Sequence, residues 1–126
     1  MDNKIFILLS MIFLHIIDDY KLQGILANMK QKIWWKEQKE YKELYKYDYI
    51  VALITHSFSW SFMIMLPIAV SLNFNIGLWV FAYIINMIIH AVVDTLKANA
   101  LKINLVTDQT IHIAQIVVTW LIFIWH

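Results

Sequence analysis

Four long apolar stretches constrain the fold of this chain more than any other feature of its sequence. They cover residues 5–27, 49–72, 76–93 and 105–125, and each is close to the roughly 20 residues that an α-helix needs to cross a bilayer. With 61% hydrophobic and only 15% charged residues in a chain of 126, the composition is too apolar for a water-soluble domain. We therefore expect an all-α, polytopic membrane protein in which four transmembrane helices form an up-down bundle.

The first stretch begins like a signal peptide, because Lys4 precedes a compact apolar run. No small-residue cleavage site follows it, and His15 stands where the cleaved segment would end, so we expect it to remain as a span. No Gly/Ser linker or internal repeat divides the chain, which predicts a single domain over residues 1–126. Cysteine is absent, which excludes disulfides and thiolate metal sites.

The lysines are distributed asymmetrically. Most lie in the connection between the first and second stretches, Lys97 and Lys102 lie between the third and fourth, and the connection between the second and third has none. The positive-inside rule therefore places both lysine-bearing connections in the cytoplasm. We expect a multi-pass protein of the inner, cytoplasmic membrane with both termini on the outer face.

The long connection, residues 24–48, has a pattern of its own. Apolar residues recur near helical spacing between lysines and glutamates, which predicts one amphipathic helix lying on the cytoplasmic face of the membrane; these residues are Ile33, Trp34, Tyr41, Leu44 and Tyr45. An interfacial anchor is the favoured role, and contact with anionic lipid or with a protein partner is the alternative. Because the lysines alternate with glutamates and no nucleic-acid-reading module is present, we expect no nucleic-acid partner.

Ionisable residues are costly inside apolar helices, at roughly 2.5–3.5 kcal/mol each on insertion scales, and they commonly mark functional sites. An imidazole and a carboxylate recur four residues apart, and so on one helix face, in the pairs His15/Asp19, His90/Asp94 and Asp108/His112. The expected topology brings these pairs to one depth near the cytoplasmic leaflet, together with His56. The predicted metal ligands are therefore His15, Asp19, His56, His90, Asp94, Asp108 and His112.

Imidazole combined with carboxylate suits divalent transition metals. We expect one or two ions, with Zn²⁺ preferred and Fe or Mn as alternatives. Such an ion activates water and polarises ester or phosphoryl oxygens, which predicts a metal-dependent hydrolase acting on a lipid or on a phosphate or ester substrate at the cytoplasmic leaflet. The candidate catalytic residues are Asp19, Asp94 and Asp108, of which one would act as general base, and Lys97, which would neutralise developing negative charge.

Four further polar residues are candidates for binding substrate or supporting the ligands: Asp18, Gln23, Asn86 and Gln109. Asp18 either adds a ligand or faces the lipid headgroups. Trp60 and its aromatic and methionine neighbours are assigned to packing, with no haem or flavin implied.

The motifs His15-x3-Asp19-Tyr20-x2-Gln23, His90-x3-Asp94-x2-Lys97 and Asp108-Gln109-x2-His112, together with His56, cover nearly the whole chain. Through these motifs the chain resembles a family of small four-span prokaryotic and phage membrane proteins whose activity is not established. In that family glycine is common where this chain has Asp18, and we therefore rank Asp18 below Asp19. The resemblance implies a shared polar site that includes Gln23, Lys97 and Gln109. A looser similarity to membrane-bound metal-dependent hydrolases rests on composition and the H-x3-D spacing.

Two other classes of protein fit the same residues. An ion or proton channel, or a transporter component, would use the ionisable residues as a pathway, continued outward by serines and asparagines in a homo-oligomer. A non-catalytic interaction protein would use them as a polar network or as a structural metal site, and would contact its partner through residues 24–48.

Overall fold

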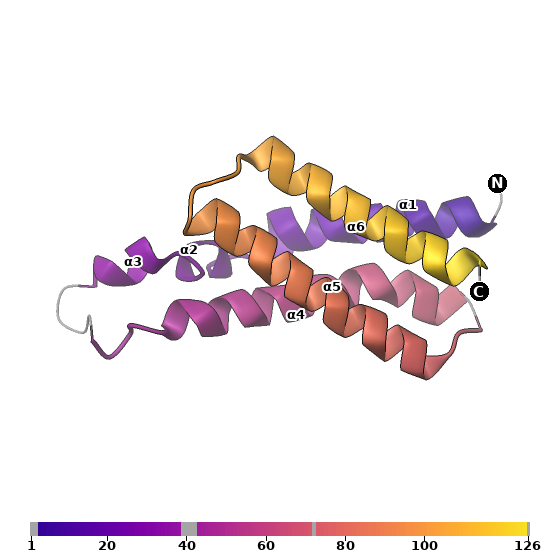
Figure 1. Cartoon of the computed structure of the whole chain (residues 1–126), viewed down its shortest axis with the longest axis horizontal. Coiled ribbons are helices and arrows are strands. Elements are labelled where there is room, and N and C mark those ends of the chain that lie inside the picture. Colours follow the sequence, from indigo (N-terminus) through magenta and orange to yellow (C-terminus); the bar gives the residue numbers. More distant parts are fainter. Residues whose placement is uncertain (1–2, 39–42, 72, 126) are drawn as a thin grey trace.

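The computed structural model describes residues 3–38, 43–71 and 73–125, and these residues form helices joined by turns, with no strand among them. The predicted all-α class is confirmed for this part of the chain. The elements are α1 (Asn3–Ile17), a π-helical turn η1 (Asp18–Leu22), α2 (Leu26–Met29), α3 (Lys32–Lys36), α4 (Asp48–Ser71), α5 (Ile76–Ala98) and α6 (Leu105–Trp125). The four long helices lie along the molecule, with both termini at one end and α2 and α3 at the other (Figure 1).

Three helices, α4, α5 and α6, are long and apolar enough to cross a membrane, and their positions match three of the four predicted stretches. α5 continues to Ala98, beyond the predicted end at residue 93, so that His90, Asp94 and Lys97 lie on one helix. α1 has only 15 residues, and η1 extends it without a break. The helical segment ends at Leu22 rather than at residue 27, because Gly24 adopts a positive φ of 52°, a conformation that commonly terminates helices.

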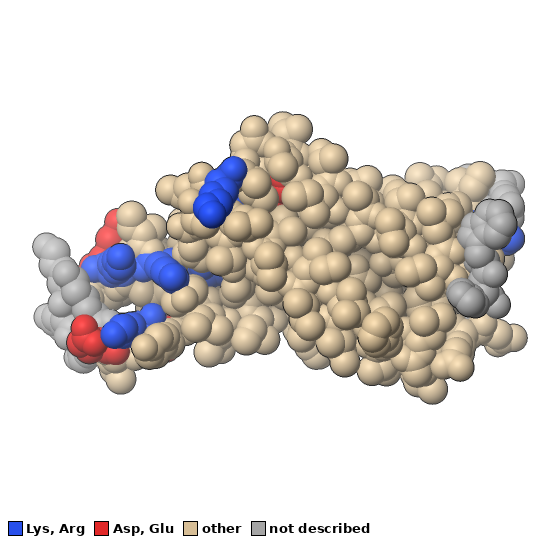
Figure 2. Space-filling view, in the orientation of Figure 1, with Lys and Arg blue, Asp and Glu red and all other residues tan. Residues whose placement is uncertain are grey.

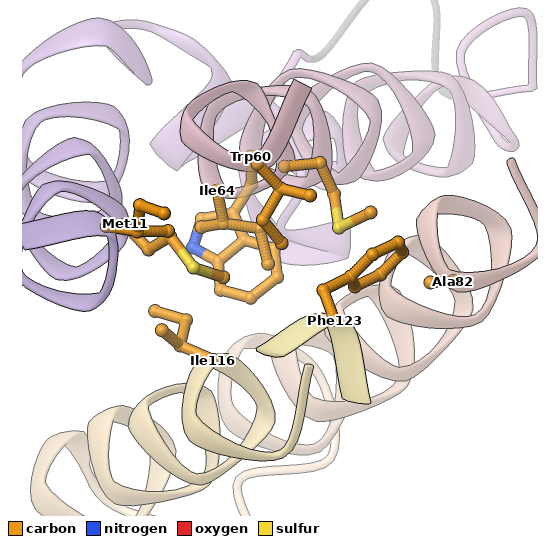
Figure 3. Close-up of a cluster of buried hydrophobic side chains, with 9 residues drawn as sticks. Met11, Trp60, Ile64, Ala82, Ile116 and Phe123 are labelled. Carbon is orange, nitrogen blue, oxygen red and sulfur yellow. The ribbon is translucent and has the colours of Figure 1, made fainter. Parts of the chain in front are cut away.

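The long helices pack in a ring, in which α1 contacts α4 and α6, and α5 contacts the same two helices. Toward the termini this interior is an apolar core, which Figure 3 shows with side chains from all four helices. Trp60 lies in this core and is fully buried. Toward α2 the interior contains buried histidine and aspartate side chains.

The connection at residues 24–48 departs from the predicted single amphipathic helix. Its described part forms two short helices, α2 and α3, separated at Gln31 by extended backbone with φ −95° and ψ 125°. The Trp35 indole donates to the Met29 carbonyl oxygen at 2.6 Å, which folds α3 back on α2. Tyr41, which supported the prediction, lies outside the described residues. Figure 2 shows charged side chains gathered at this end of the molecule, while the long helices present an almost uncharged surface.

Candidate metal centre

The ionisable residues of the predicted site meet at the junction of the four long helices. None of their side chains is more than 9% exposed. We call this set the polar cluster; its members are His15, Asp18, Asp19, His56, His90, Asp94, Asp108 and His112.

Helical spacing brings the histidine and the aspartate of each predicted pair together. In each predicted pair, an imidazole nitrogen lies close to the carboxylate one turn away, at 3.6 Å for His15 and Asp19, 3.6 Å for His90 and Asp94, and 3.4 Å for His112 and Asp108. Cross-helix contacts then join the pairs. His56 Nε2 lies 3.3 Å from Asp19 Oδ1 and 3.6 Å from Asp94 Oδ2, so α4 connects the α1 end of the cluster to the α5 end.

Asp18 is buried rather than facing headgroups, with 1% of its surface exposed. It lies three residues after His15, and positions three and four residues apart share a helix face, so Asp18 and Asp19 both point inward. Asp18 Oδ1 accepts a hydrogen bond of 2.6 Å from Ser59 Oγ, and its Oδ2 lies 3.6 Å from His56 Nδ1. Asp18 therefore belongs to the polar cluster, and its lower rank in the sequence interpretation understated its place.

Two groups of three residues within the cluster could hold a metal ion. One consists of Asp19, His56 and His90, and the other of His90, Asp94 and His112; in each group the ligand atoms all lie within 4.8 Å of one another. Ligand atoms about 2.1 Å from a tetrahedral ion lie roughly 3.4 Å apart. The 3.3 Å between His56 Nε2 and Asp19 Oδ1 in the first group and the 3.6 Å between His90 Nε2 and Asp94 Oδ2 in the second group are close to that separation.

Several buried atoms of the polar cluster lack hydrogen-bond partners within the described part of the chain. They are both ring nitrogens of His56, both of His90, Nε2 of His112, and Oδ1 of Asp19 and of Asp108. A buried polar atom without a partner costs about 1–3 kcal/mol, and native structures rarely gather several of them without an ion or water to satisfy them. A neutral imidazole has a lone pair on one of its two nitrogens, so each of these histidines could give one nitrogen, beside the carboxylate oxygens, to a divalent cation.

The free nitrogen of His112 is set by a chain of side-chain amides. Gln115 Nε2 donates to Asn86 Oδ1 at 3.1 Å, so the Gln115 amide oxygen faces His112 and pairs with its Nδ1 at 3.2 Å. Asn86 in turn donates to Thr119 Oγ1 at 2.9 Å. Nδ1 of a neutral His112 therefore carries the proton, and its Nε2 presents a lone pair to Asp108, as second-shell partners commonly arrange for metal-binding histidines.

His15 differs from the other histidines, because both of its nitrogens are engaged. The Trp60 indole donates to Nδ1 at 2.8 Å, and Nε2 pairs with Gln109 Oε1 at 3.1 Å. The Gln109 amide nitrogen then donates to Asp19 Oδ2 and to Asp108 Oδ2, both at 3.1 Å. His15 consequently has no lone pair left for an ion in this arrangement; it orients Gln109, which holds two candidate ligands.

Two lysines border the cluster. Lys30, buried at the end of α2, donates to Asp94 Oδ2 at 2.7 Å, and half-buried Lys97 donates to Asp108 Oδ2 at 2.8 Å. Lys97 was predicted from the sequence, whereas Lys30 was missed, because it comes from a different segment with no periodic relation to the cluster. The Asn99 side-chain amide holds Lys30 in position by donating to the Lys30 carbonyl oxygen at 3.0 Å.

Gln23, Trp60 and Gln115 have contacts that the sequence did not predict. Gln23 bonds to the backbone oxygen of Asp19 at 2.7 Å rather than to a ligand side chain. Trp60, assigned only to packing, stacks on His90 with ring centroids 4.2 Å apart in addition to its bond to His15. Gln115 was missed, although its position three residues after His112 on one helix face was a usable signal.

Comparisons of this chain with models of protein families, with curated proteins and with solved structures found no match. The family resemblance of the sequence motifs therefore stays a prediction, and the site is interpreted from its own chemistry.

Proposed function

We propose that this protein is a membrane-embedded metalloprotein that acts as a metal-dependent hydrolase. The observation that carries the proposal is the set of buried imidazole nitrogens that have no hydrogen-bond partner among the described residues and lie near carboxylate oxygens at distances that suit ligands of a metal ion. The proposed ligands come from His56, His90 and His112 together with Asp19, Asp94 and Asp108, while His15, Gln109 and Gln115 orient them.

In the proposed membrane arrangement, α1 and η1 together form a fourth span, and the four spans make an up-down bundle. The lysine-rich connections face the cytoplasm, which places the metal centre near the cytoplasmic leaflet. A span shorter than the local hydrocarbon thickness can be accommodated by thinning of the bilayer at modest cost.

The charges of the cluster favour at least one divalent ion. The cluster contains four carboxylates, on Asp18, Asp19, Asp94 and Asp108, and two ammonium groups border it, on Lys30 and Lys97. With neutral imidazoles these groups leave two negative charges, which one divalent ion neutralises. Zn²⁺ is the first choice for an imidazole and carboxylate ligand set, and Fe and Mn are the alternatives.

A divalent ion at this position would polarise an ester or phosphoryl oxygen and activate a water for hydrolysis. Gln109 would hold the Asp19 and Asp108 carboxylates by the bonds described above, leaving one of them to accept the proton of the water. The fixed donors of the cluster would keep their orientation during the reaction, which is how such sites stabilise developing charge.

A lipid substrate is favoured by an apolar groove of about 360 Å³ between α5 and α6, which runs along the lipid-facing side of these helices. Ile85, Ile89 and Val118 are among the residues that line it, and Asn86 and Gln115, which orient His112, lie along the same groove. An acyl chain placed there would bring a lipid ester toward the metal centre.

The test is the metal content of purified protein and of the variant His90→Ala, since His90 belongs to both candidate ligand groups. We expect stoichiometric Zn²⁺ in the wild type after loading and a loss of more than about tenfold in metal affinity in the variant. Ser57→Ala is the matched control: Ser57 is equally buried, and among the described residues its hydroxyl bonds only to the Leu53 carbonyl oxygen of its own helix. Equal metal retention by His90→Ala and Ser57→Ala would refute the proposed centre.

The hydrolase part of the proposal is tested separately, by assaying the metal-loaded wild type against lipid esters and phosphate esters in nanodiscs. We expect hydrolysis that a chelator abolishes and that Zn²⁺ restores. Metal-stabilised folding without hydrolysis of either class would reduce the centre to a structural site.

A further inference from the structure

The end of the molecule opposite the termini carries a second pocket, which we call the basic pocket. Its volume is about 480 Å³, within the roughly 300–1,000 Å³ of small-ligand sites. Its charged lining residues are Lys32, Lys36, Lys46 and Glu43. We propose that the basic pocket binds the phosphate group of an anionic lipid headgroup. The pocket shares no residue with the metal centre, and its assignment rests on the membrane orientation proposed above.

The basic pocket is built from two segments that other contacts hold together. α3 provides one wall, and the turn at residues 43–47 with the start of α4 provides the other. The Trp35 and Tyr45 rings join these walls, with their centroids 5.2 Å apart. The Lys32 backbone N–H donates to Asn99 Oδ1 at 2.8 Å, which ties the start of α3 to the end of α5.

Tyrosine rings position two of the three ammonium groups. Lys32 Nζ lies 4.9 Å from the centre of the Tyr49 ring, and Lys46 Nζ lies 5.7 Å from the centre of the Tyr47 ring. Both distances are within the range of cation–π contacts. A neutral ring attracts an ammonium group without cancelling its charge, so both lysines keep their charge for a ligand.

The positive charge of the basic pocket is not balanced by carboxylates. Lys30 and Lys97 form ion pairs at the polar cluster, whereas no carboxylate in the described part of the chain forms an ion pair with a lysine of the basic pocket. Three lysines and one glutamate give the lining two net positive charges. Lysine is a common point-charge partner of phosphate, so the charge of the pocket suits an anionic phosphate ester.

Exposed apolar side chains beside the basic pocket favour a lipid over a soluble anion. Ile33 is 61% exposed and Leu44 is 70% exposed, and they belong to the same two segments as the pocket lysines. Apolar side chains next to lysines are typical of segments that lie in the interface of a bilayer. In the proposed orientation the pocket lies on the cytoplasmic side of the membrane, where the leaflet carries anionic lipids.

Native mass spectrometry of the detergent-solubilised full chain tests the inference by resolving bound lipids during titration. Phosphatidylglycerol is anionic, whereas phosphatidylcholine carries the same phosphate with no net charge. We expect one tightly bound phosphatidylglycerol per chain, and binding of phosphatidylcholine that is weaker by about tenfold or more. Equal affinity for the two lipids would overturn the inference.

Charge variants test the pocket itself. We expect the affinity for phosphatidylglycerol to fall about fivefold in Lys36→Gln and in Lys46→Gln, which is the contribution of one lysine near an anionic headgroup. Lys102→Gln is the control, since it removes the same charge from an exposed position between α5 and α6. Glu43→Gln raises the net charge of the pocket and should strengthen binding. Equal losses in Lys36→Gln and Lys102→Gln, or weaker binding in Glu43→Gln, would contradict the assignment.

Two further titrations identify the source of the phosphate and the place of binding. Glycerophosphoglycerol is the same headgroup without acyl chains, and we expect it to compete only weakly. Displacement of the lipid at equal concentration would show that a soluble phosphate ester is the ligand and overturn the lipid assignment. Removal of metal by a chelator should leave lipid binding unchanged, so that either proposal can fail without the other. Lipid binding that is lost with the metal would place the lipid at the metal centre and overturn the basic pocket as its site.

Discussion

At the level of single residues, the hydrogen bonds of each histidine decide what it can do, and spacing along the chain does not reveal them. The sequence predicted His15 and His112 as equivalent ligands. Trp60 and Gln109 occupy both nitrogens of His15, while Gln115 occupies only Nδ1 of His112. Residue types at helical spacing could identify the cluster, but the assignment of direct and supporting roles required neighbours from other helices.

The indole of Trp60 provides a test of the supporting role of His15. Trp60→Phe keeps a ring against His90 and removes the donor to His15 Nδ1. We expect a loss of about 1 kcal/mol in stability and a metal affinity about tenfold lower, the lower end of effects seen for supporting groups, measured by competition with a chelator. Trp79→Phe is the control, because it removes an indole donor to the Met65 carbonyl oxygen on the apolar side. Equal affinities in the two variants would contradict the supporting role.

At the level of elements, the apolar stretches predicted α4, α5 and α6 well, because length and hydropathy alone determine whether a segment can cross a bilayer. α2 and α3 were not predictable in this way. Their break at Gln31 is fixed by contacts distant in sequence, since Asn99 donates to the Lys30 carbonyl oxygen and accepts from the Lys32 backbone N–H at 2.8 Å. The same contacts carry Lys30 into the site, which explains why neither the break nor the lysine was expected.

Removal of the Asn99 side chain tests this anchoring. In Asn99→Ala we expect faster hydrogen–deuterium exchange over residues 26–36, since two hydrogen bonds worth about 1 kcal/mol each are lost. Gln31→Ala is the control, because the one bond of Gln31 Nε2 within the described part of the chain goes to the nearby Ala27 carbonyl oxygen. Unchanged exchange in Asn99→Ala would show that α2 is held by other contacts.

At the level of the whole molecule, the distribution of lysines predicts the orientation in the membrane: the two lysine-bearing connections lie in the cytoplasm, and the connection between α4 and α5 lies outside. The absence of cysteine allows single cysteines to be introduced at exposed positions in the three connections, with Lys36→Cys, Asn73→Cys and Lys102→Cys. A membrane-impermeant maleimide added to intact cells should label Asn73→Cys only. Labelling of Lys36→Cys or Lys102→Cys from outside would reverse the orientation, and labelling of all three would contradict the bundle of four spans.

X-ray absorption spectroscopy of the purified, zinc-loaded protein tests the proposed centre most directly, because it reports the bound metal and its ligands together. We predict a first shell of nitrogen and oxygen at about 2.0–2.2 Å without sulfur, and outer-shell scattering from imidazole rings that weakens in His90→Ala. A protein that binds no zinc, or a spectrum without imidazole scattering, would contradict the proposal that these four helices meet around a metal ion.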